Sequence, residues 1–198
     1  MFTGIIKEIG FVDTIQKEGT NIHFWIRAEM SSELKIDESV AHNGVCLTVV
    51  EIEDGRFKVT AIEETLKKTS LGELQVDHAI NLERAMLQSA RFDGHMVQGH
   101  VDTVGRCLDV QEVDGSWYYT FEYDRDVEHV LVDKGSVAIN GTSLTVVEPV
   151  GNQFKVAIIP YTYAHTTFKF LKKGDSVNLE FDIMGKYVAK YVQLYMNK

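Results

Sequence analysis

Cysteine, proline and long apolar runs are scarce in this chain. Only two cysteines and two prolines occur among the 198 residues. Cys46 and Cys107 are not equivalent in the internal repeat described below, so we expect no duplicated disulfide and a reducing, cytoplasmic location. No apolar run approaches the roughly 18 residues of a membrane span, and the first residues lack the basic start and long apolar core of a signal peptide. We therefore expect no membrane partner.

Clustered positive charge and cofactor motifs are absent as well. The formal net charge is −9, and lysines and arginines never cluster, which argues against a nucleic-acid partner because phosphate neutralisation needs such clusters. The sequence has no Walker loop, no Gly-x-Gly-x-x-Gly fingerprint and no metal-ligand spacing. We therefore expect neither a metal ion nor a dinucleotide cofactor. The apolar content of 44% is sufficient for ordinary hydrophobic cores.

The sequence repeats itself. Residues Ser39–Glu51 return as Ser136–Glu148, and the offset continues without a gap to Asn81–Glu83 against Asn178–Glu180. About twenty of the paired positions are identical, far more than chance gives, and the period is too long for a solenoid. We predict two similar domains, residues 1–95 and 96–184, followed by a C-terminal helix in residues 185–198.

Short strands dominate both halves. Residues 22–28 alternate between apolar and polar side chains, although Trp25 interrupts the polar face. Asn43-Gly44 and Asn140-Gly141 are hairpin turn pairs that tolerate positive φ. Turn signals recur every 8 to 12 residues or so, giving about six short strands per half. This pattern predicts an all-β chain with a small closed barrel in each half.

Helical signal is weaker. Residues 126–132 and 65–70 each favour a short helical segment, whereas residues 186–195 form an amphipathic pattern. Tyr187, Tyr191 and Tyr195 fall on one face of that last helix, which has no counterpart in the first half. The helix either packs against its own barrel or forms an oligomer interface, and the sequence pattern favours neither interpretation.

The two copies differ at positions where polar chemistry is available. Cys46 is replaced by Ser143, and His42 by Ile139. Cys46 lies among apolar neighbours, so it is either a small core residue or a pocket residue whose sulfur corresponds to a serine hydroxyl group. The exchange of His42 is more simply explained by drift between the copies.

The segment from Gly94 to Asp102 has the densest polar content of the chain. Residues five apart in an extended strand point to opposite faces, so His95 and His100 are not expected to share a metal ion. Gly94 and Gly99 allow close backbone approach. One of the two histidines either lines a pocket, as a base or proton shuttle near a thiol, or lies in a solvated loop.

Four motifs together resemble the alpha-type riboflavin synthase family. They are Met1-Phe-Thr-Gly-Ile-Ile6, Asn43-Gly-Val-Cys-Leu-Thr-Val49, Gly94-His-Met-Val-Gln-Gly-His-Val-Asp102 and Asn140-Gly-Thr-Ser-Leu-Thr-Val146. The resemblance covers essentially the whole chain, in the same order. It implies two tandem six-stranded Greek-key barrels followed by a C-terminal α-helix. It also implies a homotrimer held by the C-terminal helices, with each site between the N-terminal barrel of one subunit and the C-terminal barrel of another.

The activity implied by the resemblance is the dismutation of 6,7-dimethyl-8-ribityllumazine. One molecule donates a four-carbon unit to a second, giving riboflavin and 5-amino-6-(D-ribitylamino)uracil. No cofactor is needed, because the substrate carries its own electrophilic ring and an acidic methyl group. Two like pockets with unlike chemistry suit two copies of one ligand, and holding them together supplies proximity. The resemblance further implies an association with lumazine synthase.

The resemblance also implies a set of site residues. The first-half pocket is expected to contain Gly4, Ile5, Ile6, Cys46, Leu47, Thr48, Thr60, Ala61, Ile62, Glu63, Glu64 and Thr65. The second-half pocket is expected to contain Gly99, His100, Val101, Lys134, Ser143, Leu144, Thr145, Ile159, Pro160, Tyr161, Thr162, Tyr163 and Ala164. The catalytic set is Cys46, His100, Ser39, Ser143, Thr145 and Asp182. His100 is expected to move the methyl proton, and Cys46, or a hydroxide that it positions, to add to the partner ring.

One departure from the family pattern concerns Asn140, where many members carry Asp. An amide neither acts as a base nor carries charge, so the turn explains this residue better than catalysis does. A second interpretation of the whole chain is a non-catalytic lumazine- or flavin-binding protein on the same barrels. The histidine segment and Ser143–Thr145 favour the enzyme. A flavin reductase-like barrel is disfavoured by the missing dinucleotide fingerprint.

Overall fold

The computed structural model describes residues 1–87, 89, 91–126 and 129–196. In the first half, six antiparallel strands close into a barrel in the order β1-β2-β5-β4-β3-β6. Joins between strands that are not consecutive, such as β2 with β5, make it a Greek-key barrel. The strands are β1 (Glu8–Glu18), β2 (Asn21–Arg27), β3 (Ser39–His42), β4 (Val45–Glu53), β5 (Arg56–Ala61) and β6 (Ala79–Arg84).

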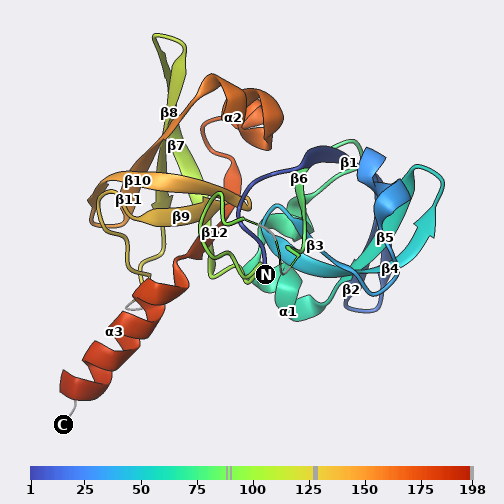
Figure 1. The fold of residues 1–198 in the computed structure, drawn as a ribbon, viewed down its shortest axis with the longest axis horizontal. Coiled ribbons are helices and arrows are strands. Elements are labelled where there is room, and N and C mark those ends of the chain that lie inside the picture. Colours follow the sequence, from blue (N-terminus) through green and yellow to red (C-terminus); the bar gives the residue numbers. More distant parts are fainter. Residues whose placement is uncertain (88, 90, 127–128, 197–198) are drawn as a thin grey trace.

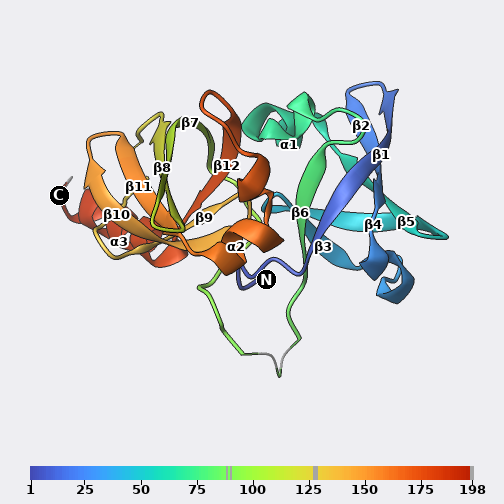
Figure 2. The ribbon, with the colours of Figure 1, turned by 90° about the horizontal axis from the view of Figure 1, so that it is seen from above.

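The second half repeats this topology. Its barrel closes in the order β10-β11-β8-β7-β12-β9. Read from β7 in the opposite direction around the closed barrel, this is the order of the first barrel with each strand number raised by six. The strands are β7 (Thr103–Val113), β8 (Ser116–Tyr123), β9 (Ser136–Ile139), β10 (Thr142–Val150), β11 (Gln153–Ile158) and β12 (Ser176–Phe181). Figure 2 shows the two barrels side by side. The prediction of an all-β chain with two closed barrels is confirmed.

Turn chemistry fixes the hairpins that the two copies share. Asn43 and Gly44 have φ of 45° and 80°, and Asn140 and Gly141 have φ of 46° and 78°. Two consecutive residues with positive φ match the twist of a two-residue hairpin. Trp25 explains the imperfect alternation of β2, since it is buried under the side chains of Arg56 and Lys58.

Short helices follow β2, β5 and β11. They are η1 (Glu29–Glu33), α1 (Glu63–Lys68), η2 (Ser70–Glu73), α2 (Pro160–His165) and η3 (Thr167–Phe170). The predicted turn at residues 65–70 overlaps α1 and η2, whereas α2 was not predicted. The predicted helix at 126–132 is wrong for the residues described there, which are not helical, while 127 and 128 lie outside the described residues.

The C-terminal helix α3 (Ile183–Met196) contains the predicted segment 186–195 and projects away from the second barrel (Figure 1). Its three tyrosines Tyr187, Tyr191 and Tyr195 are 64%, 76% and 81% exposed. The alternative in which this face packs on its own barrel is therefore wrong within the single chain. Among the described residues, no helix has the length and hydropathy needed to cross a bilayer.

A polar network joins the barrels across a pseudo-twofold axis. Asn81 Nδ2 donates to the Asn140 carbonyl at 2.9 Å, and Asn178 Nδ2 donates to the Asn43 carbonyl at the same distance. Within the first barrel, Asn43 Oδ1 accepts a hydrogen bond from the Asn81 amide, and within the second barrel Asn140 Oδ1 accepts one from the Asn178 amide, both at 2.8 Å. All four side chains are buried, and these bonds satisfy polar groups that would otherwise be costly to bury. Each barrel thus orients the hairpin turn of the other.

Candidate functional site

Cys46 and Ser143 occupy equivalent places, each one residue into the strand that follows the shared hairpin turn. Cys46 pairs with Ala41 across β3 and β4, and Ser143 pairs with Ala138 across β9 and β10. Both side chains are half-buried. The interpretation of Cys46 as an enclosed core residue is therefore disfavoured.

Two backbone segments, which we call arms, lie over these residues, one at Gly4 and one at Gly99. Each arm covers the barrel of the other half. The Ser143 amide donates to the Gly4 carbonyl at 2.8 Å, and the Cys46 amide donates to the Gly99 carbonyl at 2.9 Å. A Cβ atom on either glycine would lie 2.6 Å from the Cβ of the residue beneath it, and both glycines have positive φ. Only glycine permits this approach. Figure 2 shows the N-terminal arm running between the barrels.

The exchange corrects the predicted grouping of site residues. Gly4 was assigned to the pocket of Cys46, but it lies against Ser143 of the second barrel. Gly99 was assigned to the pocket of Ser143, but it lies against Cys46, and Val101 packs on the first hydrophobic core. Assigning each segment to the barrel of its own half misses this exchange, because the polypeptide crosses the pseudo-twofold axis at both arms.

Two buried carboxylates hold the arms in place. Glu83 accepts hydrogen bonds from the amides of Thr3 and Gly4 at 2.7 and 3.0 Å. Glu180 accepts from the amides of Gln98, Gly99 and His100 at 2.6, 2.9 and 2.9 Å. Burial raises the pKa of both carboxyl groups, to about 7 for Glu180. Neither residue was predicted as functional, although the paired segments Asn81–Glu83 and Asn178–Glu180 were the available signal.

The two histidines of the 94–102 segment have different surroundings. This segment is not a continuous strand, since only an isolated bridge joins Val97 to Phe2. His95 Nδ1 lies 2.7 Å from the Ser143 hydroxyl oxygen, and His95 is half-buried. His100 is exposed and its amide is bound to Glu180. The predicted set of site residues does not contain His95, because its contact with Ser143 joins residues 48 apart in the sequence.

The remaining predicted residues of the first barrel differ in their burial. Ser39 of β3 is directly opposite Thr48 of β4, and the Thr48 side chain is exposed, whereas Leu47 points into the core. Thr60, the last residue but one of β5, has its hydroxyl group 2.9 Å from His23 Nδ1. The predicted edge then continues through Ala61, which is buried, and the exposed Ile62 into the start of α1 at Glu63, Glu64 and Thr65.

The second barrel presents the equivalent face with different side chains. Thr145 is exposed and opposite Ser136, and Leu144 is half-buried. The predicted edge 159–164 forms most of α2, where Tyr163 stacks on Trp117 with ring centroids 3.8 Å apart. Lys134 is exposed at positive φ, in the turn whose counterpart in the first barrel carries Asp37. Asp182 lies between β12 and α3 and accepts from the Met184 amide at 2.9 Å.

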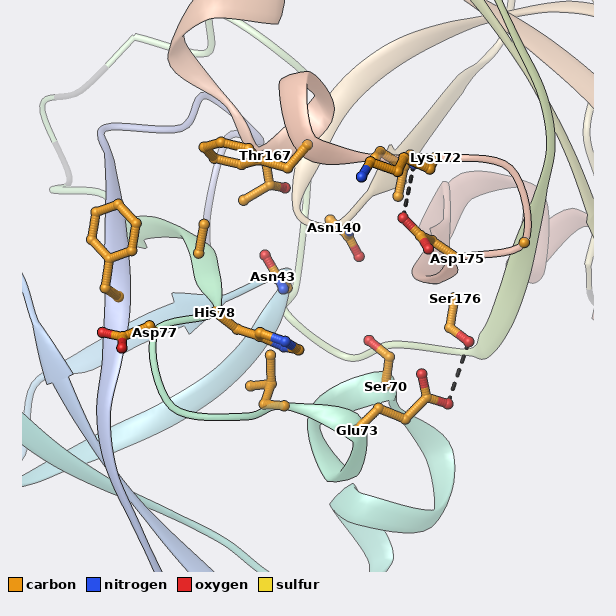
Figure 3. A pocket seen from close by; sticks show the side chains of 16 residues that line it. Asn43, Ser70, Glu73, Asp77, His78, Asn140, Thr167, Lys172, Asp175 and Ser176 are labelled. Atoms are coloured by element: carbon orange, nitrogen blue, oxygen red, sulfur yellow. Dashed lines mark hydrogen bonds between the residues drawn. The ribbon is translucent and has the colours of Figure 1, made fainter.

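A cavity of about 610 Å³ lies between the barrels, with Asn43 and Asn140 at the pseudo-twofold axis. Figure 3 shows Asn43 and Asn140 in the middle of this cavity, with Glu73 and Asp175 beside them. Among the described residues that line it, none belongs to the predicted site. Of the predicted residues, Thr48, His100 and Thr145 are exposed, whereas Gly4, Leu47, Ala61 and Gly99 are buried.

The repeat matches a known domain. The family model described as the lumazine binding domain matches twice, at residues 3–85 and 98–182. A riboflavin synthase from Actinobacillus pleuropneumoniae is 40% identical over 97% of this chain and 90% of its own length. The chain belongs to the riboflavin synthase family. The resemblance inferred from the four motifs is therefore confirmed.

Further members of the riboflavin synthase family and one solved structure agree with this assignment. A riboflavin synthase from Bacillus subtilis (strain 168) is 36% identical over 97% of this chain and 90% of its own length. The crystal structure of LumP complexed with 6,7-dimethyl-8-(1'-D-ribityl) lumazine has a TM-score of 0.83 at 22% identity, covering 91% of this chain and 98% of that one. At this identity the structural likeness supports the double-barrel fold alone.

Proposed function

We propose that this chain is a riboflavin synthase that converts two molecules of 6,7-dimethyl-8-ribityllumazine into riboflavin and 5-amino-6-(D-ribitylamino)uracil. The observation that carries the proposal is the near full-length match to riboflavin synthases. The duplicated barrels also suit a reaction between two copies of one heterocycle. The rival, a non-catalytic lumazine-binding protein, shares the fold but is supported only at 22% identity.

We place the two lumazine pockets on the outer faces of the barrels. The first contains Cys46, Leu47 and Thr48, covered by Gly99, His100 and Val101. The second contains Ser143, Leu144 and Thr145, covered by Gly4, Ile5 and Ile6. Hydroxyl groups at the exposed strand positions suit the ribityl chain, and the backbone of the arms suits the polar edge of the ring. Lys134, which has no basic counterpart in the first barrel, distinguishes the second pocket.

Chemistry is assigned to two residues of the first pocket, where the segment that carries His100 covers Cys46. His100 accepts the proton of the acidic methyl group on one lumazine, while Cys46, or a hydroxide that it positions, adds to the ring of the other. Ser39, Ser143, Thr145 and Asp182 supply hydrogen bonds around the reacting rings. The hydrogen bonds that Asn140 Oδ1 and the Asn140 carbonyl accept support a structural role for this residue, so no carboxylate is required there.

A homotrimer through α3 would complete the sites. Thr48, His100 and Thr145 of the proposed pockets are exposed in one chain, and α3 exposes an apolar face that includes Met184, Val188 and Leu194 at 59% or more. Placing the first-barrel face of one subunit against the second-barrel face of another would bring two rings together and exclude water.

Cytoplasmic location is supported by the two free cysteines. Association with lumazine synthase is tested by co-elution of the two purified enzymes.

Incubating the purified protein with the lumazine alone tests the proposed activity. Riboflavin fluorescence should rise with time, with one riboflavin formed for every two lumazines consumed. A shifted lumazine spectrum without riboflavin would instead support the binding-protein interpretation. An unchanged spectrum would contradict both.

A further inference from the structure

The cavity between the barrels has walls that take no part in the proposed lumazine pockets. Its volume of about 610 Å³ falls within the range of small-molecule sites. η2 and the start of β6 line it from the first barrel, and η3 and the start of β12 line it from the second. The Ser70 amide of η2 donates to Asn178 Oδ1 and the Thr167 amide of η3 donates to Asn81 Oδ1, both at 2.7 Å. The network that joins the barrels therefore also holds both walls of the cavity.

Two side-chain amides at the centre of this cavity have unpaired donors, and we call them the central amides. They belong to Asn43 and Asn140, which are each 7% exposed and stand in the middle of the cavity in Figure 3. Their Oδ1 atoms accept from the amides of Asn81 and Asn178, which fixes the other end of each carboxamide as the NH2 group. Neither Nδ2 atom donates to an acceptor in the described part of the chain. Such donors, on side chains more than nine-tenths buried, favour a ligand that supplies an acceptor.

Carboxylates from both barrels lie beside the central amides. Glu73 of η2 and Asp175, which precedes β12, line the same cavity (Figure 3). Glu73 Oε1 accepts from Ser176 Oγ at 3.3 Å, and Asp175 Oδ2 accepts from the Lys172 amide at 2.8 Å. A carboxylate offers about four acceptor positions, so each of the two can accept further hydrogen bonds. Strong acceptors thus flank a pair of donors.

The charges around the cavity favour a neutral ligand. The ionisable residues that line it within the described chain are Glu73, Asp77, His78, Lys172 and Asp175. The carboxylates outnumber the lysine, which disfavours an anion. The central amides offer N–H groups, which cannot ligate a cation, and no three described His, Cys, Asp or Glu side chains are placed to hold a metal ion. A neutral ligand with an acceptor between two donors therefore fits best.

We propose that this cavity binds a cyclic ureide, the class of neutral rings in which a carbonyl group lies between two N–H groups, as in uracil. The carbonyl oxygen has two lone pairs and accepts one hydrogen bond from each central amide. The flanking N–H groups donate to Glu73 and Asp175. The rings of Phe11 and Phe170, which also line the cavity, suit the faces of a flat heterocycle. The site is separate from the lumazine pockets and does not rest on the proposed function.

A titration of the full-length, ¹⁵N-labelled protein with uracil tests this site directly. The side-chain NH2 signals of Asn43 and Asn140 should shift saturably, with a dissociation constant of about 1 mM for a ligand of this size. 1,3-Dimethyluracil keeps the carbonyl groups but has no N–H group, so it should bind the wild-type protein at least about tenfold more weakly. Unshifted signals up to the solubility limit of uracil, as expected if water alone fills the cavity, would overturn the proposal. Equal binding of the two ligands would overturn it as well.

Variants of the central amides test the donors. Asn43→Asp and Asn140→Asp each keep an oxygen for the strand amide but replace the NH2 group by an acceptor that repels the ligand carbonyl. Each should weaken uracil binding at least about tenfold. Asn152→Asp makes the same charge change at an exposed residue outside the cavity lining and should leave the affinity within about twofold. Unchanged affinity in both cavity variants would contradict the proposal.

A surface variant keeps the test decisive if the buried variants do not fold, as judged by their melting temperatures. Glu73→Ala removes an exposed acceptor and should weaken uracil binding about fivefold. Glu112→Ala, at an exposed glutamate of β7 outside the cavity lining, is the matched control. Equal affinities in Glu73→Ala and Glu112→Ala would remove the carboxylate from the site and overturn the proposed binding mode.

The failure of this inference and that of the proposed function are distinguishable. Riboflavin formation without any shift of the central amide signals would overturn the ureide site alone. Saturable uracil binding by a protein that forms no riboflavin would support the site and contradict the proposed function. A parallel titration with 5-amino-6-(D-ribitylamino)uracil identifies the source of the ligand. Binding at the central amides at least about tenfold tighter than that of uracil would assign the site to this product, and binding no tighter would assign it to free uracil-type bases.

Discussion

The two barrels are alike where they contact each other and unlike where ligands are expected. The hairpin turns at Asn43 and Asn140 have nearly the same backbone angles, and each accepts the same hydrogen bond from an asparagine of the other barrel. By contrast, Cys46 holds the position that Ser143 fills in the other copy, and among the described residues Ser143 but not Cys46 is hydrogen-bonded to a histidine. The turn that precedes β3 carries Asp37, and the equivalent turn before β9 carries Lys134.

This difference indicates which residues the scaffold requires. A residue that serves the pseudo-twofold contact needs an identical partner on the other barrel, because each hydrogen bond is made twice. A residue on an outer face has no such constraint, so the copies can differ there in charge and nucleophilicity. Comparing the two halves therefore separates architecture from chemistry within a single chain.

Removing the helix that only the second barrel carries should have the largest effect. Deleting residues 186–198 should yield a monomer and reduce turnover at least about a hundredfold, because neither open face would then meet its partner. Light scattering gives the mass and riboflavin fluorescence the rate. Tyr191→Glu, which charges the exposed face of α3 in a full-length chain, should act in the same direction. An active monomer would refute the intersubunit arrangement.

Filling the pseudo-twofold contact should destabilise both barrels together. In Gly44→Ala, the new Cβ atom would lie 2.7 Å from the Gly141 amide nitrogen, at a φ of 80°. We expect a loss of about 3 kcal/mol in unfolding free energy from the clash and the strained backbone. Gly19→Ala also has positive φ but no atom within 4 Å of its Cβ atom, so it should cost only about 1 kcal/mol. Equal losses of unfolding free energy in Gly44→Ala and Gly19→Ala, measured by urea denaturation, would mean that the contact between Gly44 and Gly141 does not stabilise the protein.

His42, which the second barrel replaces with Ile139, should make stability depend on pH. His42 is fully buried, its Nε2 has no hydrogen-bond partner among the described residues, and burial lowers its pKa from 6.5 to about 4. A lowered pKa means that the folded state disfavours the protonated ring. The stability that the folded state has while His42 is neutral is present above pH 6.5 and is lost as the pH falls towards 4.

The corresponding experiment makes the first barrel like the second. Between about pH 8 and about pH 5, wild-type protein should lose on the order of 2 kcal/mol through His42. His42→Ile should remove this part of the loss, measured by chemical denaturation at both pH values. His78→Asn, at an exposed histidine, provides the control. An identical pH dependence in wild type and His42→Ile would contradict the assignment.

Exchanging the unlike pocket residues should have the smallest effect, on rate rather than folding. Cys46→Ser makes the first pocket resemble the second and should lower kcat about tenfold, or about 1.4 kcal/mol, because a hydroxyl group is a weaker nucleophile than a thiolate. Ser143→Cys provides the reciprocal change. Unchanged turnover in Cys46→Ser would exclude the thiol from the reaction while leaving the fold and the pocket unaffected.

Much of the fold could be predicted because it depends on local pattern. The turn pairs at Asn43 and Asn140 specify hairpins by their own conformational preference, and the 97-residue offset makes the second barrel follow from the first. Helix α2 was missed because proline and two tyrosines at residues 160–163 give no strong helical pattern, and tertiary packing of Tyr163 on Trp117 accompanies it. Residues 126–132 favoured a helix that the described part of the segment does not form.

The sequence by itself determined that this chain is duplicated, that each copy is a barrel, and that the copies differ at Cys46 and Ser143. Only the tertiary structure decided which arm covers which barrel, and that His95 reaches Ser143 across 48 residues of sequence. The physical reason is that turns and strand periodicity are local properties of the chain. The crossing of the arms depends instead on buried carboxylates and on glycines that allow two distant backbones to touch.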